Sequence, residues 1–290
     1  MSEAAITVPA QSTVRALHRR LWAIAAYAVL GLAAALFLLP FAWMLSTSLK
    51  QPAQVLVYPP VWVPSPITLA NFVVPLTLMP MSRYFFNTAV VAVVVVACQL
   101  ITASLAAFAF ARLRFPGRRV AFLMTLGMMM VPVQVTLIPL YISVSRLGLV
   151  NSYSGLVLPF LSTSFGTFLL RQFFLTLPQE LVDAGHIDGC NHFRVYYSIF
   201  LPLSKTALAT LAVFTFMSQW NGFLWPLVVT STDDMKVWTL GLLNFKGLYG
   251  TTYNVLMAGA LIGVLPPLVA FVFLQRYFVE GITLTGIQGR

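Results

Sequence analysis

Long apolar runs limit the fold of this chain more than any other feature of its sequence. Only 8% of its residues are charged and 59% are hydrophobic, whereas soluble domains carry about 25% charged residues. Runs of about 20 apolar residues recur along the chain, and each can cross a hydrocarbon core of about 30 Å as a helix. The sequence therefore predicts an all-α integral membrane protein with six transmembrane helices, at residues 21–44, 87–110, 120–142, 155–174, 202–217 and 254–277.

The segments around these expected spans differ in composition. Residues 1–14 are small and polar, as in a disordered tail, and the first apolar run is too long for the h-region of a signal peptide, so we expect an uncleaved first span. Residues 50–83 are rich in proline, which cannot continue a helix, and residues 218–253 contain tryptophans suited to a membrane interface. Both segments are expected as long loops. Pro132 and Pro139 are expected to interrupt the third span.

The basic residues divide unequally between the two sides of the membrane. Six spans place both termini on one side, and that side holds 12 of the 17 Lys and Arg residues, against 5 on the other. The positive-inside rule therefore predicts that both termini and the loop at residues 178–202 are cytoplasmic. The expected domains are a cytoplasmic tail at 1–20, a six-span transmembrane domain at 21–277 and a second cytoplasmic tail at 278–290.

The expected membrane interior has no ionisable side chain that could carry a proton or an ion. None of the seven acidic residues and none of the three histidines falls within an expected span. Ion-driven carriers and membrane redox enzymes usually need such groups at membrane depth. Uncharged polar residues remain, and they either hydrogen-bond neighbouring helices or line a path for a hydroxyl-rich solute: Asn87, Gln99, Thr102, Ser104, Gln134 and Thr136. Asn87, Gln134 and, after the fifth span, Asn221 are the candidate pathway residues.

The sequence contains no recognisable site for chemistry. It has no phosphate-binding loop of the form GxxxxGK[ST], and Cys190 and His192 lack the further spaced partners of a zinc site. We therefore expect no catalytic residue, no metal and no cofactor bound by this chain. The energy for transport is expected to come from a separate subunit.

The 178–202 loop concentrates the charge that the spans lack. Three of the seven acidic residues lie in it. Pro178 is placed to open a short helix with acidic residues in its first turns, and Gly189 is placed to end it. Small residues at 184, 185 and 189 would let the backbone of another protein approach closely. The pattern predicts a helix that docks into a partner, with a solvated linker as the alternative.

At this loop the chain resembles the permease subunits of ATP-binding-cassette (ABC) importers. Asp183-Ala184-Gly185, Gly189, Ile199, Leu201 and Pro202 reproduce the spacing of the EAA---G---------I-LP motif of that family. Further stretches are similar to the carbohydrate, maltose-permease-like branch, and the resemblance covers residues 20–290: 39–50, 64–72, 111–119, 128–141, 169–174, 219–227 and 275–286. Two positions depart from the motif, since Asp183 replaces its glutamate and Gly185 its second alanine.

This resemblance implies a type I ABC importer permease fold and a set of partners in a bacterial or archaeal cell membrane. The partners are a homologous second permease, an ATPase dimer that binds ATP and Mg, an extracytoplasmic solute-binding protein and membrane lipid, without nucleic acid. The solute implied is a sugar, and a polyol phosphate such as glycerol 3-phosphate is the alternative. The alternative from a different class of transport protein is an ion-coupled secondary carrier.

The resemblance also implies roles for particular residues. Contact with the ATPase would involve residues of the 178–202 loop: Glu180, Asp183, Ala184, Gly185, Ile187, Asp188, Gly189 and Pro202. In the outer loop, Phe245, Tyr249 and Tyr253 would contact sugar or binding protein, or else anchor the chain at the membrane interface.

Overall fold

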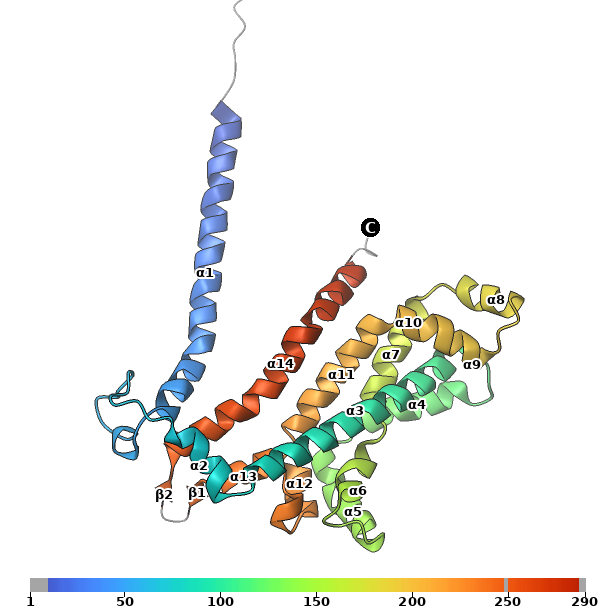
Figure 1. The fold of residues 1–290 in the computed structure, drawn as a ribbon. Helices are drawn as coiled ribbons and strands as arrows, with labels where there is room; N and C mark the ends of the chain where they lie inside the picture. The colour runs from blue at the N-terminus through green and yellow to red at the C-terminus, as the bar shows by residue number, and fades with distance from the viewer. Residues whose placement is uncertain (1–9, 248–249, 287–290) are drawn as a thin grey trace, which may run out of the picture.

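The computed structural model describes residues 10–247 and 250–286, and its elements are almost all helical (Figure 1). In chain order they are α1 (Ala10–Ser48), η1 (Pro52–Gln54), α2 (Ala70–Leu78), α3 (Met81–Arg112), α4 (Arg118–Met129), α5 (Val133–Arg146), α6 (Tyr153–Val157), η2 (Leu158–Phe160), α7 (Ser164–Thr176), α8 (Glu180–Ile187), α9 (His192–Val195), the π-helix η3 (Tyr196–Phe200), α10 (Leu201–Leu203), α11 (Lys205–Trp220), α12 (Leu224–Val229), η4 (Asp233–Met235), α13 (Trp238–Leu243), β1 (Lys246–Gly247), β2 (Gly250–Thr251) and α14 (Tyr253–Gly286).

Three helices are long and apolar enough to cross a membrane singly: His18–Ser48 within α1, the whole of α3, and Tyr253–Gln275 within α14. Three further spans would each consist of two helices that meet at an angle. The angle is 102° between α4 and α5, 41° between Tyr153–Phe160 and α7, and 78° between His192–Leu203 and α11. The described residues thus hold three to six candidate spans, and each expected span overlaps a single helix or a bent pair.

The third and fifth expected spans are not continuous helices. Pro132 adopts an extended conformation ahead of α5 and has no N–H for a helical hydrogen bond, so α4 and α5 are separate helices. Contrary to prediction, Pro139 does not divide the span, because α5 continues through it. The fifth span was expected to begin at Pro202, but Pro202 lies in α10, and α11 begins after the bend, at Lys205.

Segments expected as loops or tail contain further regular structure. Residues 10–14 are helical, the 50–83 segment contains α2, and the 218–253 segment contains α12, α13 and an antiparallel pair of short strands. These elements are short and pack against the long helices, as where Trp238 of α13 lies buried beside Tyr84 and Met81 of α3. Tertiary packing therefore stabilises them, which local composition does not reveal.

Hydrogen bonds to other elements satisfy several polar side chains of α3. Gln99 of α3 donates from Nε2 to the Phe160 carbonyl (2.8 Å) and accepts from Thr215 Oγ1 of α11 (2.8 Å). Thr102 donates to the Leu161 carbonyl, and the Ser104 and Tyr196 hydroxyls lie 2.8 Å apart. For these residues the helix–helix alternative is the one observed, as expected where no water is present to satisfy polar groups.

The two ends of the bundle carry different features. Figure 1 shows the N-terminal end of α1, the C-terminal end of α14 and the short helix α8 at one end. α5, α12 and the β1–β2 pair lie at the opposite end. Helix α1 stands apart from the other long helices except near its C-terminal end, and its most apolar window has no buried residue. Its apolar surface therefore requires lipid or another chain.

Candidate functional site

Helix α8 is a short, well-delimited helix within the 178–202 loop. Its N-cap is Gln179, whose carbonyl accepts hydrogen bonds from the N–H groups of Val182 (2.9 Å) and Asp183 (3.2 Å). Glu180 and Asp183 lie in the first turn, where negative charge is favourable. Gly189 ends the helix in the left-handed conformation, with φ of 77°, which glycine adopts without steric cost. The predicted acidic first turn and the end at Gly189 are confirmed, whereas the helix begins at Glu180, two residues after Pro178.

The two faces of α8 have different environments. Val182 and Gly185 are buried, and a Cβ at Gly185 would lie 3.1 Å from Val195 Cγ2 and 3.2 Å from Ile199 Cδ1. The opposite face is exposed along its length, and the Ile187 side chain is 86% exposed. The exposed residues of the predicted coupling set are Glu180, Asp183, Ala184, Ile187, Asp188, Gly189 and, beyond the helix, Pro202. Gly185 is the exception: it was expected on the docking surface, and it packs against its own chain.

Side-chain contacts order the part of the loop that follows α8. The Asn191 side chain caps α9 by accepting from the Arg194 N–H (2.8 Å). The rings of His186 and His192 meet edge to face with centroids 4.8 Å apart, and His186 Nδ1 lies 3.0 Å from the Cys190 carbonyl. Among the described residues no group of three or more His, Cys, Asp or Glu side chains could hold a metal ion.

Arg112, the last residue of α3, joins three elements at the base of this loop. Its Nη2 donates to the carbonyls of Phe174 (2.6 Å) and Leu177 (2.5 Å) at the C-terminal end of α7, and its Nη1 donates to Gln179 Oε1 (2.7 Å). Gln179 Nε2 in turn donates to Asp183 Oδ1 (3.2 Å). The last carbonyls of a helix have no partner within it, and a cation is favourable there. Arg112 therefore caps α7 and reaches α8 through one intervening side chain.

A cavity of about 190 Å³ lies between α3, α5, α6, the last turn of α11 and the segment that follows it. Its lining is mainly apolar, with polar contributions from Thr88, Gln134, Ser218 and Gln219, and no charged side chain among the residues that line it. Of the three candidate pathway residues, only Gln134 lines this cavity. Asn221 lies outside the lining and donates to the Met217 carbonyl (2.8 Å).

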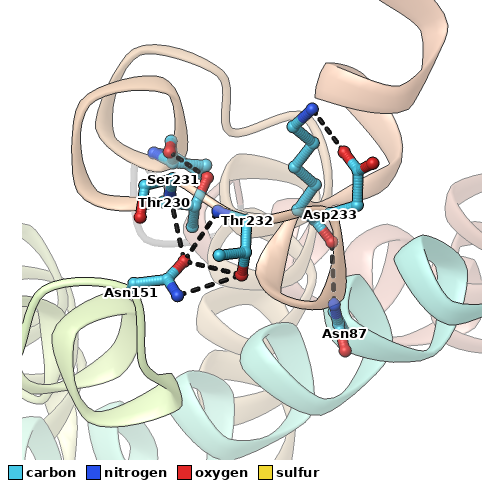
Figure 2. Close-up of polar contacts among 8 residues, drawn as sticks. Asn87, Asn151, Thr230, Ser231, Thr232 and Asp233 are labelled. Carbon is cyan, nitrogen blue, oxygen red and sulfur yellow. Dashed lines mark hydrogen bonds and ion pairs between the residues drawn. The ribbon is translucent and has the colours of Figure 1, made fainter.

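Asn87, the third candidate, is fully buried near the start of α3 and packs that helix against a loop. Its Nδ2 donates to the carbonyls of Asp234 and Lys236, both at 2.8 Å, and its Oδ1 accepts from the Tyr153 hydroxyl. Figure 2 shows this amide under the loop that carries Asp233. The structure therefore places Asn87 in a helix–loop contact, away from the cavity lining.

A second asparagine holds the same loop from the other side (Figure 2). Asn151 Oδ1 accepts from the N–H groups of Ser231 (2.9 Å) and Thr232 (3.1 Å), and its Nδ2 donates to Thr232 Oγ1 (2.9 Å). Asn151 adopts a positive φ of 56°, which asparagine tolerates better than most residues. Nearby, a hydrogen bond and the charge of Lys236 lower the pKa of Asp233 from its ordinary value.

The three aromatic residues proposed for the outer loop occupy different settings. Phe245 is 6% exposed and packs with Met81, Tyr84 and Trp238, so it is not free to contact a solute or a partner in this conformation. Tyr253, at the start of α14, is 39% exposed. Tyr249 lies outside the described residues.

Comparison with known proteins decides the family. Residues 99–283 match the family described as binding-protein-dependent transport system inner membrane component. The chain belongs to this family. The permease is 37% identical over 227 residues to the arabinooligosaccharides transport system permease protein AraQ of Halalkalibacterium halodurans, which covers 78% of this chain and 81% of the relative. It is 40% identical over 207 residues to the sn-glycerol-3-phosphate transport system permease protein UgpE of Rhizobium meliloti, which covers 71% and 73% respectively.

The fold of the permease has a counterpart among solved structures. A chain of a bacterial ABC transporter involved in the import of the acidic polysaccharide alginate superimposes with a TM-score of 0.79 at 23% identity, covering 89% of this chain and 97% of that chain. The predicted ABC importer permease is thus confirmed, as is the predicted helical membrane fold of this type. A secondary carrier or a membrane enzyme is not supported by any of these likenesses.

Sequence reasoning missed the permease's Arg112, Gln179 and Asn151. In the sequence, Arg112 is only one of the 12 basic residues on the expected cytoplasmic side. A signal was present, because an arginine in the last turn of a long helix is placed to bind carbonyls. The sequence could not reveal that those carbonyls belong to α7.

Proposed function

We propose that this chain is one of two permease subunits of a heteromeric, ATP-driven importer in a bacterial or archaeal cell membrane. Residues 21–277 would form the transmembrane domain with six spans, three of them bent, between cytoplasmic tails at 1–20 and 278–290. The location of α8, the N-terminal end of α1 and the C-terminal end of α14 at one end of the bundle supports a shared cytoplasmic side. The exposed apolar surface of α1 supports contact with lipid or with the second permease.

The exposed face of α8 is the observation that carries this proposal. A helix that buries Val182 and Gly185 against its own chain, while Asp183, Ala184 and Ile187 remain exposed, has one face available for a partner. The partner is an ATPase dimer that binds ATP and Mg, and this chain binds neither. ATP-driven closure of the dimer would move α8 and change which side of the membrane the spans open to. Such coupling requires that the docked helix differ in free energy between the two states.

The solute we propose is a neutral mono-, di- or oligosaccharide delivered by an extracytoplasmic binding protein. The cavity lined by Gln134, Ser218 and Gln219 offers hydrogen-bonding groups without charge, which suits hydroxyl groups. The 37% identical relative is named for arabinooligosaccharides. A polyol phosphate is the second candidate, because relatives up to 40% identical are named for sn-glycerol 3-phosphate. A phosphate is best bound by cationic side chains, and the second permease would have to supply them.

The proposal is tested on the complete importer, with its cognate ATPase and binding protein, in proteoliposomes. Ile187→Asp places a charge on the exposed face of α8 without disturbing its buried face, so we expect uptake to fall at least about tenfold, the factor that a loss of 1.4 kcal/mol represents. The ATPase should also copurify less well. Arg114→Gln, at an exposed residue of the neighbouring turn, is the control. Unchanged uptake and copurification in Ile187→Asp and in Asp183→Lys would contradict docking through α8.

The same preparation distinguishes the two solutes. The binding protein is loaded in turn with neutral oligosaccharides and with glycerol 3-phosphate, and ATP hydrolysis and uptake are measured. Stimulation by glycerol 3-phosphate alone would reject the sugar proposal and leave the docking proposal standing.

A further inference from the structure

We propose that Arg112 is a positioning residue that links α8 to the long helix α3. Through this link, movement of the docked helix α8 would reach the wall of the 190 Å³ cavity. This inference rests on the proposed docking of α8. The inference adds a defined physical connection between the exposed face of α8 and the cavity proposed to bind the solute.

The guanidinium group of Arg112 donates hydrogen bonds to three acceptors, two at the end of α7 and one at the N-cap of α8. Nη2 binds the Phe174 and Leu177 carbonyls, and Nη1 binds Gln179 Oε1. The Cζ atom also lies 5.2 Å from the centroid of the Phe200 ring, which belongs to the buried cluster under α8. A planar fork with several N–H groups can satisfy such a set at once, whereas the single ammonium of lysine cannot reproduce it.

The bond to Gln179 continues directly to the exposed face of α8. Gln179 Nε2 donates to Asp183 Oδ1, and Asp183 makes no ion pair with any residue that the structure describes. The carboxylate that faces the partner is therefore joined to α3 by two successive side-chain hydrogen bonds. A change in the position of α8 must either carry Arg112 with it or break one of these bonds.

Helix α3 extends from Arg112 to the opposite end of the bundle. It runs unbroken over 32 residues from Met81, and Thr88 and Val91 in its first turns line the cavity. Arg112 and Thr88 are 24 positions apart, which corresponds to about 36 Å at a rise of about 1.5 Å per residue. The path from α8 through the segment His192–Leu203 is different, because that segment meets α11 at 78°. Arg112 is thus a direct hydrogen-bonded connection from the N-cap of α8 to the helix whose opposite end lines the cavity, in addition to the apolar packing of Val182 in the cluster that contains Ala107.

The experiment compares variants in the reconstituted complete importer by the number of ATP molecules hydrolysed per solute transported. Gln179→Leu removes the two side-chain bonds of Gln179, to Arg112 and to Asp183, and leaves the cap on α7, so it avoids the folding defect that a replacement of Arg112 risks. We expect this ratio to rise about fivefold or more in Gln179→Leu and Arg112→Lys, since typical coupling factors begin near fivefold. The ATPase should remain bound, and the double variant should be no worse than Arg112→Lys alone. Arg114→Gln, two residues along, should keep the wild-type ratio.

A purely structural role would lower uptake and ATP hydrolysis in parallel, or reduce the yield of assembled complex, and would leave the ratio unchanged. A wild-type ratio in Gln179→Leu would overturn the proposal. Loss of ATPase copurification in Ile187→Asp tests docking itself, so failure of docking and failure of the Arg112 link are distinguishable.

Discussion

Replacement of Asn87 by alanine should destabilise the permease without changing which solutes it transports. The side chain is fully buried and makes three hydrogen bonds, two donated to carbonyls of the 230–236 loop and one accepted from Tyr153. At about 1 kcal/mol net for each bond, the expected loss is about 3 kcal/mol. The former partners are only partly buried, and the Asp234 carbonyl still accepts from Arg83 Nε (3.4 Å), so their loss of a partner adds little to this cost.

Asn87→Asp is the sharper variant because it keeps the shape of the side chain. It replaces the donor that faces the Asp234 and Lys236 carbonyls with an oxygen, and the ionised form would be a buried charge facing two acceptors. We expect it to be at least as destabilising as Asn87→Ala. Both losses of stability are expected from the hydrogen bonds of Asn87 alone, without any contact between Asn87 and the solute.

The assay is thermal unfolding of the detergent-purified importer, combined with competition for uptake by a panel of sugars. Gln134→Ala is the matched control, because Gln134 is an exposed polar residue that lines the cavity. It should leave the unfolding midpoint unchanged and alter uptake. A normal midpoint in Asn87→Ala together with altered solute preference would refute the reasoning and return Asn87 to the solute path.

Two further predictions concern packing and pH. Gly241→Ala should cost about 1–3 kcal/mol or more by overpacking, because its Cβ would lie 2.5 Å from Met81 Sδ and closer still to the Tyr84 ring. The measurement is the yield of folded Gly241→Ala protein compared with that of Gly127→Ala, a helical position where a Cβ would meet nothing within 4 Å. Equal yields of the two variants would contradict the overpacking prediction. The lowered pKa of Asp233 means that its ion pair with Lys236 stabilises the fold at neutral pH and that this contribution is lost as the pH falls through that pKa. The difference in unfolding midpoint between the wild type and Lys236→Met should therefore be small, since Asp233 is largely exposed, and should shrink on acidification; a difference that grows at acidic pH would be the opposite result.

The family motif and the positions of the spans could be predicted from sequence because each depends on short-range information. A run of apolar residues must find a non-aqueous environment wherever the rest of the chain lies. The ends of α8 could be predicted for the same reason, since Gly189 and the acidic first turn act on their own helix. The assignment to ABC permeases came from residue spacing within one loop, and the match over residues 99–283 confirmed it.

The direction of each side chain, by contrast, depended on which helices meet. Asn87 and Gln134 are both uncharged polar residues in apolar segments of the sequence. Asn87 nevertheless hydrogen-bonds a loop 147 positions away, whereas Gln134 lines a cavity. Gly185 appears to be part of an exposed small face until Val195 and Ile199 pack over it. The bend of 102° follows Pro132, which the sequence shows, whereas the bend of 78° ahead of α11 was not predicted.

Sequence alone therefore determined that this chain lies in a membrane, which segments hold its apolar spans, and which loop carries the short helix α8. Only the tertiary structure decided which polar groups are satisfied and that Arg112 of α3 reaches the carbonyls of α7 and the cap of α8. The physical reason is that hydrophobic length and helix capping act within a few residues, whereas hydrogen bonds inside an apolar bundle are made by whichever distant groups the packing brings together.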